Sequence, residues 1–422
     1  MQTASVGQGS AYDIVLKDFY EGPIRKHLNN NVTILKYVER SKRKWSGRQV
    51  LFPVHLRRNT GVGARSEQGQ LPVAGRQTYV ESRIRTKHMY GRITMTGAVI
   101  AASQGDRGAF ATALRTEIDG MRTDLRNDMN RQCFGNNLEG ITLGGDLLTG
   151  ITGILGTVTA VAGTTITTTS PGTRYLKQGM SLQAGTHDEL LAGNHQTSEV
   201  ASVTNTTVFE KTGAGTFQVN DILVRGDASD HSFSNEITGL DMIIESSGSL
   251  QNIDPAVNGE WVSKKFDNPL RSGGTSRPLS LELMQLAVDA ADEIGGTEPN
   301  LIMGHHSMRR EYINLLTSDV RYAPEQLKGG FQKLTYAGGS TPITIEFDKH
   351  APYNKLFFIR TADLKLYVQQ DWKWADRDGS TFSRLQNQDA WEAFMLWYGN
   401  LGCERRNSHV VITDLQVSNL IF

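Results

Sequence analysis

The chain has 422 residues, equal numbers of basic and acidic side chains, and only two cysteines, Cys133 and Cys403. This length allows two or three domains with substantial cores, whereas two cysteines are too few for a disulfide framework. No apolar run approaches the roughly eighteen residues of a membrane-spanning helix, and the polar first ten residues do not resemble a secretory signal. Composition therefore predicts a globular protein, made in the cytoplasm and without contact with a membrane.

The zero net charge hides a segregation of charge along the chain. Residues 1–100 contain 17 basic and 6 acidic residues, a balance of +11, so the rest of the chain balances at −11. Solvated surface charge is one interpretation. The other is self-complementarity, in which the basic region of one copy lies on the acidic body of the next. A neutral whole argues against nucleic acid as the main partner. The second interpretation predicts these inter-subunit contact residues: Lys42, Arg43, Lys44, Trp45, Arg57, Arg58, Arg65 and Arg76.

The first hundred residues predict an arm followed by an extended strand pair. Residues 10–28 are typical of a short helix that is interrupted at Gly22-Pro23. Residues 45–96 predict a long β-hairpin with a Gly-rich tip and one returning strand over residues 77–95. Because basic residues are interspersed along it, we expect this hairpin to stay outside the core and to require the surface of a neighbour.

A long amphipathic helix is predicted over residues 103–134. Apolar residues recur there every three or four positions, which places them on one stripe of a helix. The helix would be about 45 Å long, at roughly 1.5 Å per residue. Its expected buried core positions are Leu114, Ile118, Met121 and Leu125.

Residues 140–238 form a Thr- and Gly-rich block with few basic residues and a weak internal repeat at an offset of 42. Val158 and Val161, for example, recur as Val200 and Val203. The repeat predicts a β-barrel-like module with approximate two-fold symmetry, although chance similarity between Thr-rich strands is an alternative. The Thr-rich strands, the scarcity of basic residues and the repeat predict an independently folding module. Because the block is acidic, we expect it to face away from nucleic acid.

From residue 239 onward the pattern is mixed α/β. Ser280 is the expected N-cap of an amphipathic helix that ends near Ile294. A second helix is predicted over residues 307–316. The predicted strands cover residues 300–303, 341–347, 356–359, 364–368, 391–401 and 410–415.

Motifs of catalysis or metal binding are missing from the sequence. It has no phosphate-binding loop, zinc-protease helix, nucleophile elbow or Cys-x-x-Cys pair. His305-His306 is expected to cap a helix rather than to bind metal, and Asp376–Gly379 to form a hairpin turn. Trp372 and Trp374 favour core packing over a sugar-stacking platform. We therefore predict no enzyme activity, no cofactor and no metal.

The order of elements resembles the major capsid proteins of tailed bacteriophages, the Hong Kong 97-like fold. The local sequence similarity is strongest in three stretches: residues 89–96 together with 101–103, residues 127–135, and residues 278–312. The resemblance implies an α+β fold with an N-terminal arm, extended loop, spine helix, and peripheral and axial domains, to which the inserted β-barrel-like domain is added. The implied divisions are the arm (1–44), loop (45–96), spine helix and peripheral domain (97–139), insert (140–238), axial domain (239–370) and return to the peripheral domain (371–422).

The resemblance further implies self-assembly into hexamers and pentamers of an icosahedral shell around double-stranded DNA. The implied partners are further copies of the chain, a portal, separate scaffolding or decoration proteins, and packaged DNA through non-specific contacts. The implied location is the virion, after assembly in the host cytoplasm. Two alternatives stay open, an encapsulin-like nanocompartment with the same fold and a β-rich glycan-binding adhesin.

Overall fold

The computed structural model places most of the chain in two compact units. The first contains Met1–Val32, His88–Met129 and Gln370–Tyr398, and the second contains Thr33–Lys87, Asn130–Gln369 and Gly399–Phe422. The six predicted divisions stay a prediction. The structure describes residues 32–43, 47–98, 107–135, 142–143, 146–147, 153–169, 172–213, 216–227, 229–267, 276–317, 334–376 and 382–417. The helix predicted over residues 10–28 lies outside these residues.

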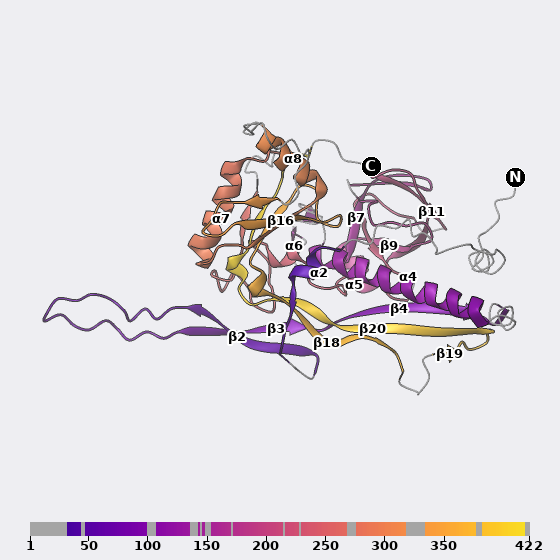
Figure 1. Ribbon diagram of the computed structural model, residues 1–422, viewed down its shortest axis with the longest axis horizontal. Coiled ribbons are helices and arrows are strands. Elements are labelled where there is room, and N and C mark those ends of the chain that lie inside the picture. Colours follow the sequence, from indigo (N-terminus) through magenta and orange to yellow (C-terminus); the bar gives the residue numbers. More distant parts are fainter. Residues whose placement is uncertain are drawn as a thin grey trace, which may run out of the picture. The chain divides into compact units, whose positions relative to one another are not determined.

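The second unit begins with a short helix, α2 (Ile34–Tyr37), and a two-residue strand, β1 (Glu39–Arg40). Buried Asp348 anchors the start of this segment by accepting a hydrogen bond from the Thr33 backbone N–H at 2.8 Å. The long hairpin follows, with β2 (Gln49–Arg57) and β3 (Thr78–Arg85) paired antiparallel (Figure 1).

The structure corrects two predictions about this hairpin. The returning segment is two strands, because pairing changes after Arg85: β3 pairs with β2, whereas β4 (Lys87–Thr96) pairs with β20. The paired part is also a core element, since Val50, Phe52 and Ile84 are buried with Tyr367. Side chains alternate across a strand, so the interspersed basic residues of β3 lie on the opposite, exposed face.

The first unit contains most of the long helix and parts of a sheet whose other strand residues, β1 among them, belong to the second unit. Helix α4 (Arg107–Phe134) confirms the predicted spine helix over the described part of its length. The five-stranded sheet has the order β1-β18-β20-β19, with β4 also paired to β20. Helix α4 packs on β4 at Gly91, where an added methyl group would lie 2.7 Å from the Leu125 side chain. The other strand bounds are β18 (Leu364–Trp374), β19 (Ser383–Arg384) and β20 (Ala390–Cys403).

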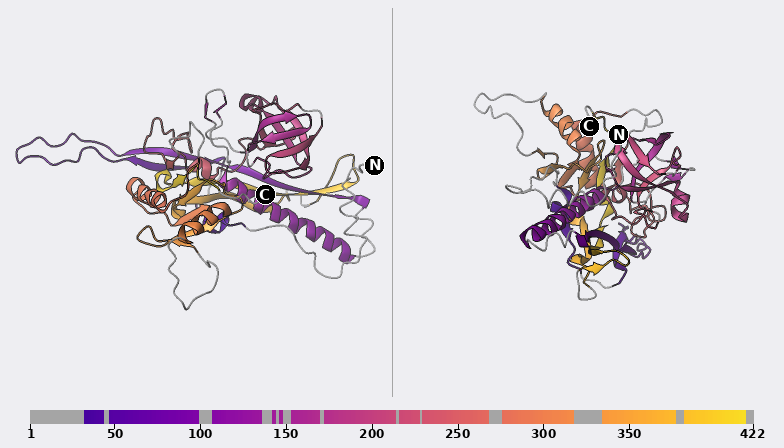
Figure 2. Two further views of the ribbon diagram at one scale, coloured as in Figure 1. Left: turned by 90° about the horizontal axis from the view of Figure 1, so that it is seen from above. Right: turned by 90° about the vertical axis from the view of Figure 1, so that its right-hand side faces the viewer.

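Residues 154–225 of the second unit form a closed six-stranded barrel with the neighbour order β10-β11-β8-β7-β12-β9 (Figure 2). If β7, β8 and β9 are exchanged with β10, β11 and β12, respectively, every pair of neighbouring strands stays the same. The topology therefore has the two-fold symmetry that the repeat predicts. The bounds are β7 (Ile154–Ala162), β8 (Thr165–Thr168), β9 (Ser181–Gly185), α5 (His187–Ala192), β10 (Gln196–Val203), β11 (Val208–Thr212) and β12 (Ile222–Arg225). Two short strands precede it, β5 (Thr142–Leu143) and β6 (Asp146–Leu147).

The remaining part of the second unit is a mixed six-stranded sheet of order β13-β21-β17-β14-β16-β15 with two helices. Helix α7 (Leu281–Gly295) begins as predicted, because the Ser280 hydroxyl accepts a hydrogen bond from the Leu283 N–H. The remaining bounds are β13 (Lys264–Phe266), β14 (Leu301–Gly304), α8 (His306–Thr317), β15 (Thr335–Tyr336), β16 (Ile343–Phe347), β17 (Leu356–Ile359) and β21 (Val410–Ile412).

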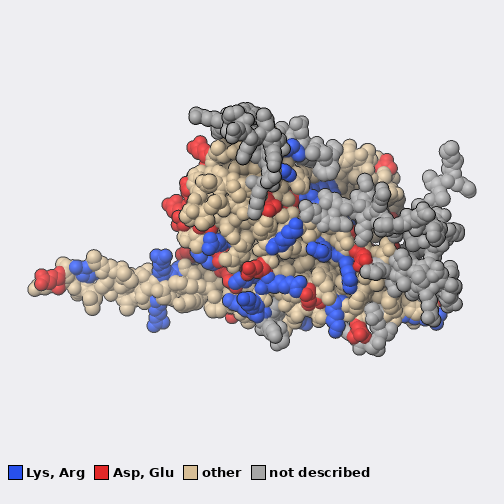
Figure 3. Space-filling view, in the orientation of Figure 1, with Lys and Arg blue, Asp and Glu red and all other residues tan. Residues whose placement is uncertain are grey.

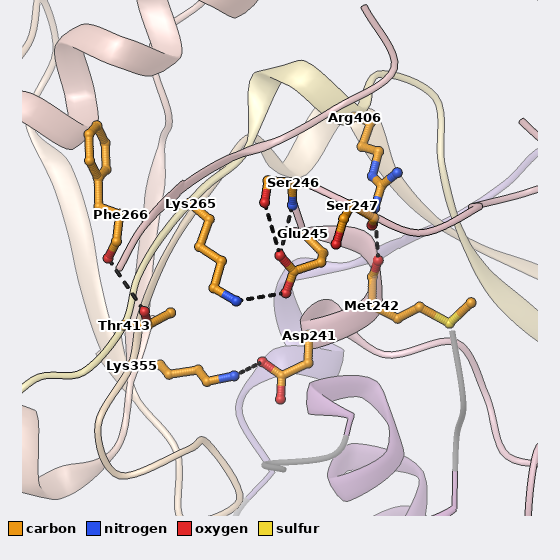
Figure 4. A network of polar contacts seen from close by, with 10 residues as sticks. All are labelled: Asp241, Met242, Glu245, Ser246, Ser247, Lys265, Phe266, Lys355, Arg406 and Thr413. Carbon is orange, nitrogen blue, oxygen red and sulfur yellow. Dashed lines mark hydrogen bonds and ion pairs between the residues drawn. The ribbon is translucent and has the colours of Figure 1, made fainter. Parts of the chain in front are cut away.

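A buried arginine ties the end of the chain to the segment that follows the barrel. This segment contains α6 (Leu240–Ile243), and two single-turn helices, η2 (Thr361–Asp363) and η3 (Arg406–Ser408), lie farther along the chain. The Arg406 side chain donates only to backbone carbonyls, which belong to Met242, Ile243, Ser247, Gly248 and Trp261. Ion pairs Lys355–Asp241 and Lys265–Glu245 lie nearby (Figure 4). Burial lowers the pKa of Arg406 to about 10, so it stays charged at neutral pH.

Candidate assembly surfaces

The tip of the long hairpin, residues 58–77, projects beyond β2 and β3 as two unpaired, extended segments (Figure 1). A turn at its end is closed by the Gly69 N–H, which donates to the Ser66 carbonyl at 2.9 Å. Nearer the strands, the two segments touch at Gly61 and Gly75. A methyl group on Gly61 would lie 2.8 Å from the Gly75 nitrogen, a distance that Cβ atoms do not tolerate. These paired glycines therefore allow the two segments to lie close together without a β-ladder.

Apolar side chains of the tip are almost fully exposed. Val62, Leu71 and Val73 have exposed fractions of 84%, 86% and 88%. These are the largest values among the exposed large hydrophobic residues in the described part of the chain. Single exposed apolar residues are ordinary, but three on one projecting loop form an apolar surface that the described residues of this chain leave uncovered. They were not predicted from the sequence, although aliphatic residues in a Gly- and Pro-containing loop were a signal.

The predicted arginine contacts of the hairpin fall into two groups. Arg57, at the end of β2, contacts its own chain, since it pairs with Glu260 at 2.9 Å and donates to the Val257 carbonyl. Arg58, Arg65 and Arg76 are exposed on the tip, where Figure 3 shows basic side chains on opposite sides of the loop. Arg65 contacts only the neighbouring Ala64 carbonyl among the interactions described. The tip therefore combines an apolar surface with free positive charge.

The predicted arm contacts are placed only in part. Lys42 is exposed, whereas Lys44 and Trp45 lie outside the described residues. The Arg43 guanidinium lies 3.6 Å from the Glu404 carboxylate and 5.2 Å from the centre of the Phe52 ring, so it covers the base of the hairpin. Whether these residues contact other subunits stays a prediction.

The predicted core positions of α4 differ in burial. Leu125 is buried, whereas Ile118 and Met121 are half-buried, and the side chain of Leu114 lies outside the described residues. Burial increases toward the end of the helix, where Met129 and Phe134 are enclosed. Among the described side chains, Ile118 and Met121 therefore keep part of their apolar surface accessible.

The residues considered above as possible metal ligands, nucleophiles or sugar-binding groups have structural roles. His305 caps α8, because its Nδ1 accepts a hydrogen bond from the Ser307 backbone N–H at 3.1 Å. Cys133 is buried, and burial raises the pKa of its thiol to about 12. Trp372 packs on Trp397 with ring centres 6.0 Å apart. Within the described residues, no group of three or more potential ligands could hold a metal ion. No helix in the same part of the chain has the length and apolarity to cross a membrane.

The fold is that of phage capsid proteins. The capsid asymmetric unit of cyanophage A-1(L) aligns with a TM-score of 0.57 at 13% identity, covering 94% of this chain and 97% of that chain. Capsid chains of the empty and native GTA particles align with TM-scores of 0.51 and 0.50, at 7% and 8% identity, over 99% of this chain and all of theirs. This near-complete coverage confirms the predicted α+β capsid fold. No protein-family model and no curated protein matches the sequence.

Proposed function

We propose that this protein is the major capsid protein of a tailed bacteriophage, which assembles into hexamers and pentamers around double-stranded DNA. The observation that carries the proposal is the likeness to capsid chains over almost the whole length. The exposed tip supports it independently, because a projecting apolar loop is useful only when a neighbour covers it. Portal, scaffolding and decoration proteins are the further partners that this function implies.

The apolar residues of the tip should contribute more to assembly than its arginines. Burying one Val or Leu side chain stabilises a contact by about 1.5–3 kcal/mol. An exposed ion pair contributes roughly 0–1 kcal/mol and weakens with salt. We therefore propose that Leu71 and Val73 anchor the tip on the next subunit, and that Arg58, Arg65 and Arg76 orient it.

The barrel is proposed to lie on the outer face of the shell. Lys177 is the only exposed basic residue in its described part, since Lys211 is buried and Arg174 and Arg225 are half-buried. Packaged DNA carries about one negative charge per 1.7 Å, so a surface of this charge would be repelled by it. The exposed acidic residues of the barrel are Asp188, Glu189, Glu199 and Glu210, and Asp227 and Asp230 follow directly after it.

The decisive experiment is to express the full chain and to image the product by electron microscopy. We expect closed shells with six- and five-fold capsomers and the barrel outside. Leu71→Asp should abolish shells while thermal unfolding of the subunit stays unchanged, because Leu71 has no core role. Gln70→Asp adds the same charge at the neighbouring exposed position and serves as the control. Soluble monomers from the wild-type chain, or equal assembly of both variants, would refute the proposal.

A further inference from the structure

The barrel loop at residues 172–177 makes a compact contact with the mixed six-stranded sheet, here called the α/β sheet. The contact is with residues 350–353, which connect β16 to β17 of that sheet. The Arg174 Nη1 donates a hydrogen bond to the Ala351 carbonyl at 2.8 Å, and the Tyr175 hydroxyl donates to the His350 carbonyl at 3.0 Å. The Arg174 guanidinium also lies 4.4 Å from the centre of the Tyr353 ring and 5.2 Å from that of Tyr175. Residues 172–177 therefore contact residues 350–353 through both hydrogen bonds and cation–π stacking.

Further charges lie against the same contact. The Arg131 guanidinium is 5.5 Å from the centre of the Tyr175 ring and pairs with Glu236 at 2.5 Å, where both side chains are buried. Asp348, which precedes the contact, is buried and accepts hydrogen bonds from the Asn130 amide and the Thr33 backbone. The contact thus has two guanidinium groups, and it joins the barrel, the end of α4 and the start of α2.

Two uncharged histidines complete the contact. The His350 ring centre lies 6.1 Å from that of Tyr175, and its Nδ1 is 3.1 Å from the Asn130 amide nitrogen. The His305 ring meets the Tyr353 ring edge-on at 4.3 Å, and its Nδ1 accepts the hydrogen bond that caps α8. A proton on either Nδ1 would remove its acceptor and add positive charge beside the guanidinium groups.

Burial, with the charges that face each ring, keeps both histidines neutral. The pKa of His350 is lowered to about 4, mainly by burial and in addition by Lys349, Arg174 and Arg131, whereas Asp348 acts in the opposite direction. Burial lowers the pKa of His305 to about 3, again helped by positive charge, from Arg174, His306 and Arg310. Both rings are therefore unprotonated in the closed contact at neutral pH.

We propose that this contact is an acid-sensitive latch, which holds the barrel on the α/β sheet at neutral pH and releases it when the two histidines are protonated. In the open state both histidines regain an ordinary pKa near 6.5. Stability of the closed latch is therefore complete above about pH 6.5 and is lost as the pH falls toward 4 and 3. At pH 4.5 each histidine should raise the open-to-closed ratio on the order of a hundredfold.

Hydrogen exchange of the full chain, followed by mass spectrometry at pH 7 and pH 4.5 and corrected for intrinsic rates, tests the latch. We expect exchange over residues 172–180 and 346–354 to rise at least tenfold at pH 4.5, by the same linkage, while strands β9 and β12 stay protected. The double variant His305→Gln, His350→Gln should lose this response. His409→Gln, a buried histidine away from the contact, should keep it. An unchanged wild-type latch at pH 4.5, or a double variant that still responds, would refute the proposal.

A second variant separates the latch from acid effects on the whole fold. Arg174→Lys keeps the charge but loses the planar stack, so residues 172–180 should exchange faster at pH 7 without loss of the barrel strands. Tyr353→Phe keeps the ring and should match the wild type. If the double histidine variant does not fold, the wild-type pH series and Arg174→Lys decide the matter. Protection of Arg174→Lys equal to that of the wild type would show that no latch exists.

Discussion

The base and the tip of the long hairpin belong to one continuous segment, yet they have opposite environments. At the base, the Phe52 and Tyr367 rings are stacked with centres 6.2 Å apart, and Ile84 is enclosed beside them. At the tip, Leu71 and Val73 are exposed to solvent at 86% and 88%. The base is therefore part of the folded core, whereas the apolar surface of the tip is the one that we propose a neighbouring subunit covers.

If the proposed function holds, the base of the hairpin stabilises the subunit and the tip stabilises its association with a neighbour. A substitution in the base should change the free energy of unfolding, and a substitution in the tip should change assembly alone. The outer edge of β3 is also bound to the rest of the unit, through Gln251. The Arg83 N–H donates to the Gln251 carbonyl, and the Ser82 hydroxyl donates to the Gln251 side chain. The boundary between the two roles lies near Arg57, which holds the end of β2 to Glu260.

The largest expected effect is at the base. Ile84→Asp should prevent folding, because it places an unpaired carboxylate in a buried apolar cluster. Leu51→Asp introduces the same group on the exposed face of the paired strand β2 and should leave the fold intact. Circular dichroism and thermal unfolding of the two variants would check this. A folded Ile84→Asp subunit would remove the distinction between base and tip.

Burial also differs between apolar positions of helix α4, so substitutions along it should differ in their effect on stability. Leu125→Ala should lower the free energy of unfolding by about 2–5 kcal/mol, because the side chain is buried against β4 at Gly91. Ile118→Ala, at a half-buried position, should cost less in the isolated subunit. Urea unfolding measures both. A larger loss for Ile118 than for Leu125 would contradict the burial gradient along α4.

A substitution at the paired glycines should affect assembly and leave stability unchanged. Gly75→Val would bring a side chain against the Thr60 nitrogen, 2.8 Å from the position of a Cβ, and would separate the two segments of the tip. We expect fewer shells at an unchanged unfolding temperature. Gly63→Val is the control, because the nearest atom there is a flexible Arg65 nitrogen at 3.6 Å. Shells scored by sedimentation should distinguish the two.

The smallest expected effect is that of charge reversal at the tip. Arg58→Glu combined with Arg76→Glu should slow assembly at low salt and should matter less as ionic strength rises, since exposed charges are screened. The effect should stay below that of Leu71→Asp. Light scattering during assembly at several salt concentrations would test the order. A double reversal that outweighs Leu71→Asp would make charge the main contact of the tip.

Local patterns in the sequence were sufficient for several elements. The Ser280 N-cap, the long helix α4 and the strand Ala390–Cys403 follow from capping chemistry and periodicity within one segment. The repeat at an offset of 42 predicted the symmetric barrel, because each copy carries the same three strands. In these cases the signal and the structure lie within the same few dozen residues.

Tertiary structure alone decided which surfaces are buried. The hairpin base enters the core because Tyr367, more than three hundred residues later, packs on Phe52, and no local pattern contains that pairing. The break between β3 and β4 depends likewise on β20, a distant partner. Arg174 meets Tyr353 only when the barrel lies on the α/β sheet. Helix caps and repeats act over short separations along the chain, whereas exposure and charge environment depend on which distant segments meet.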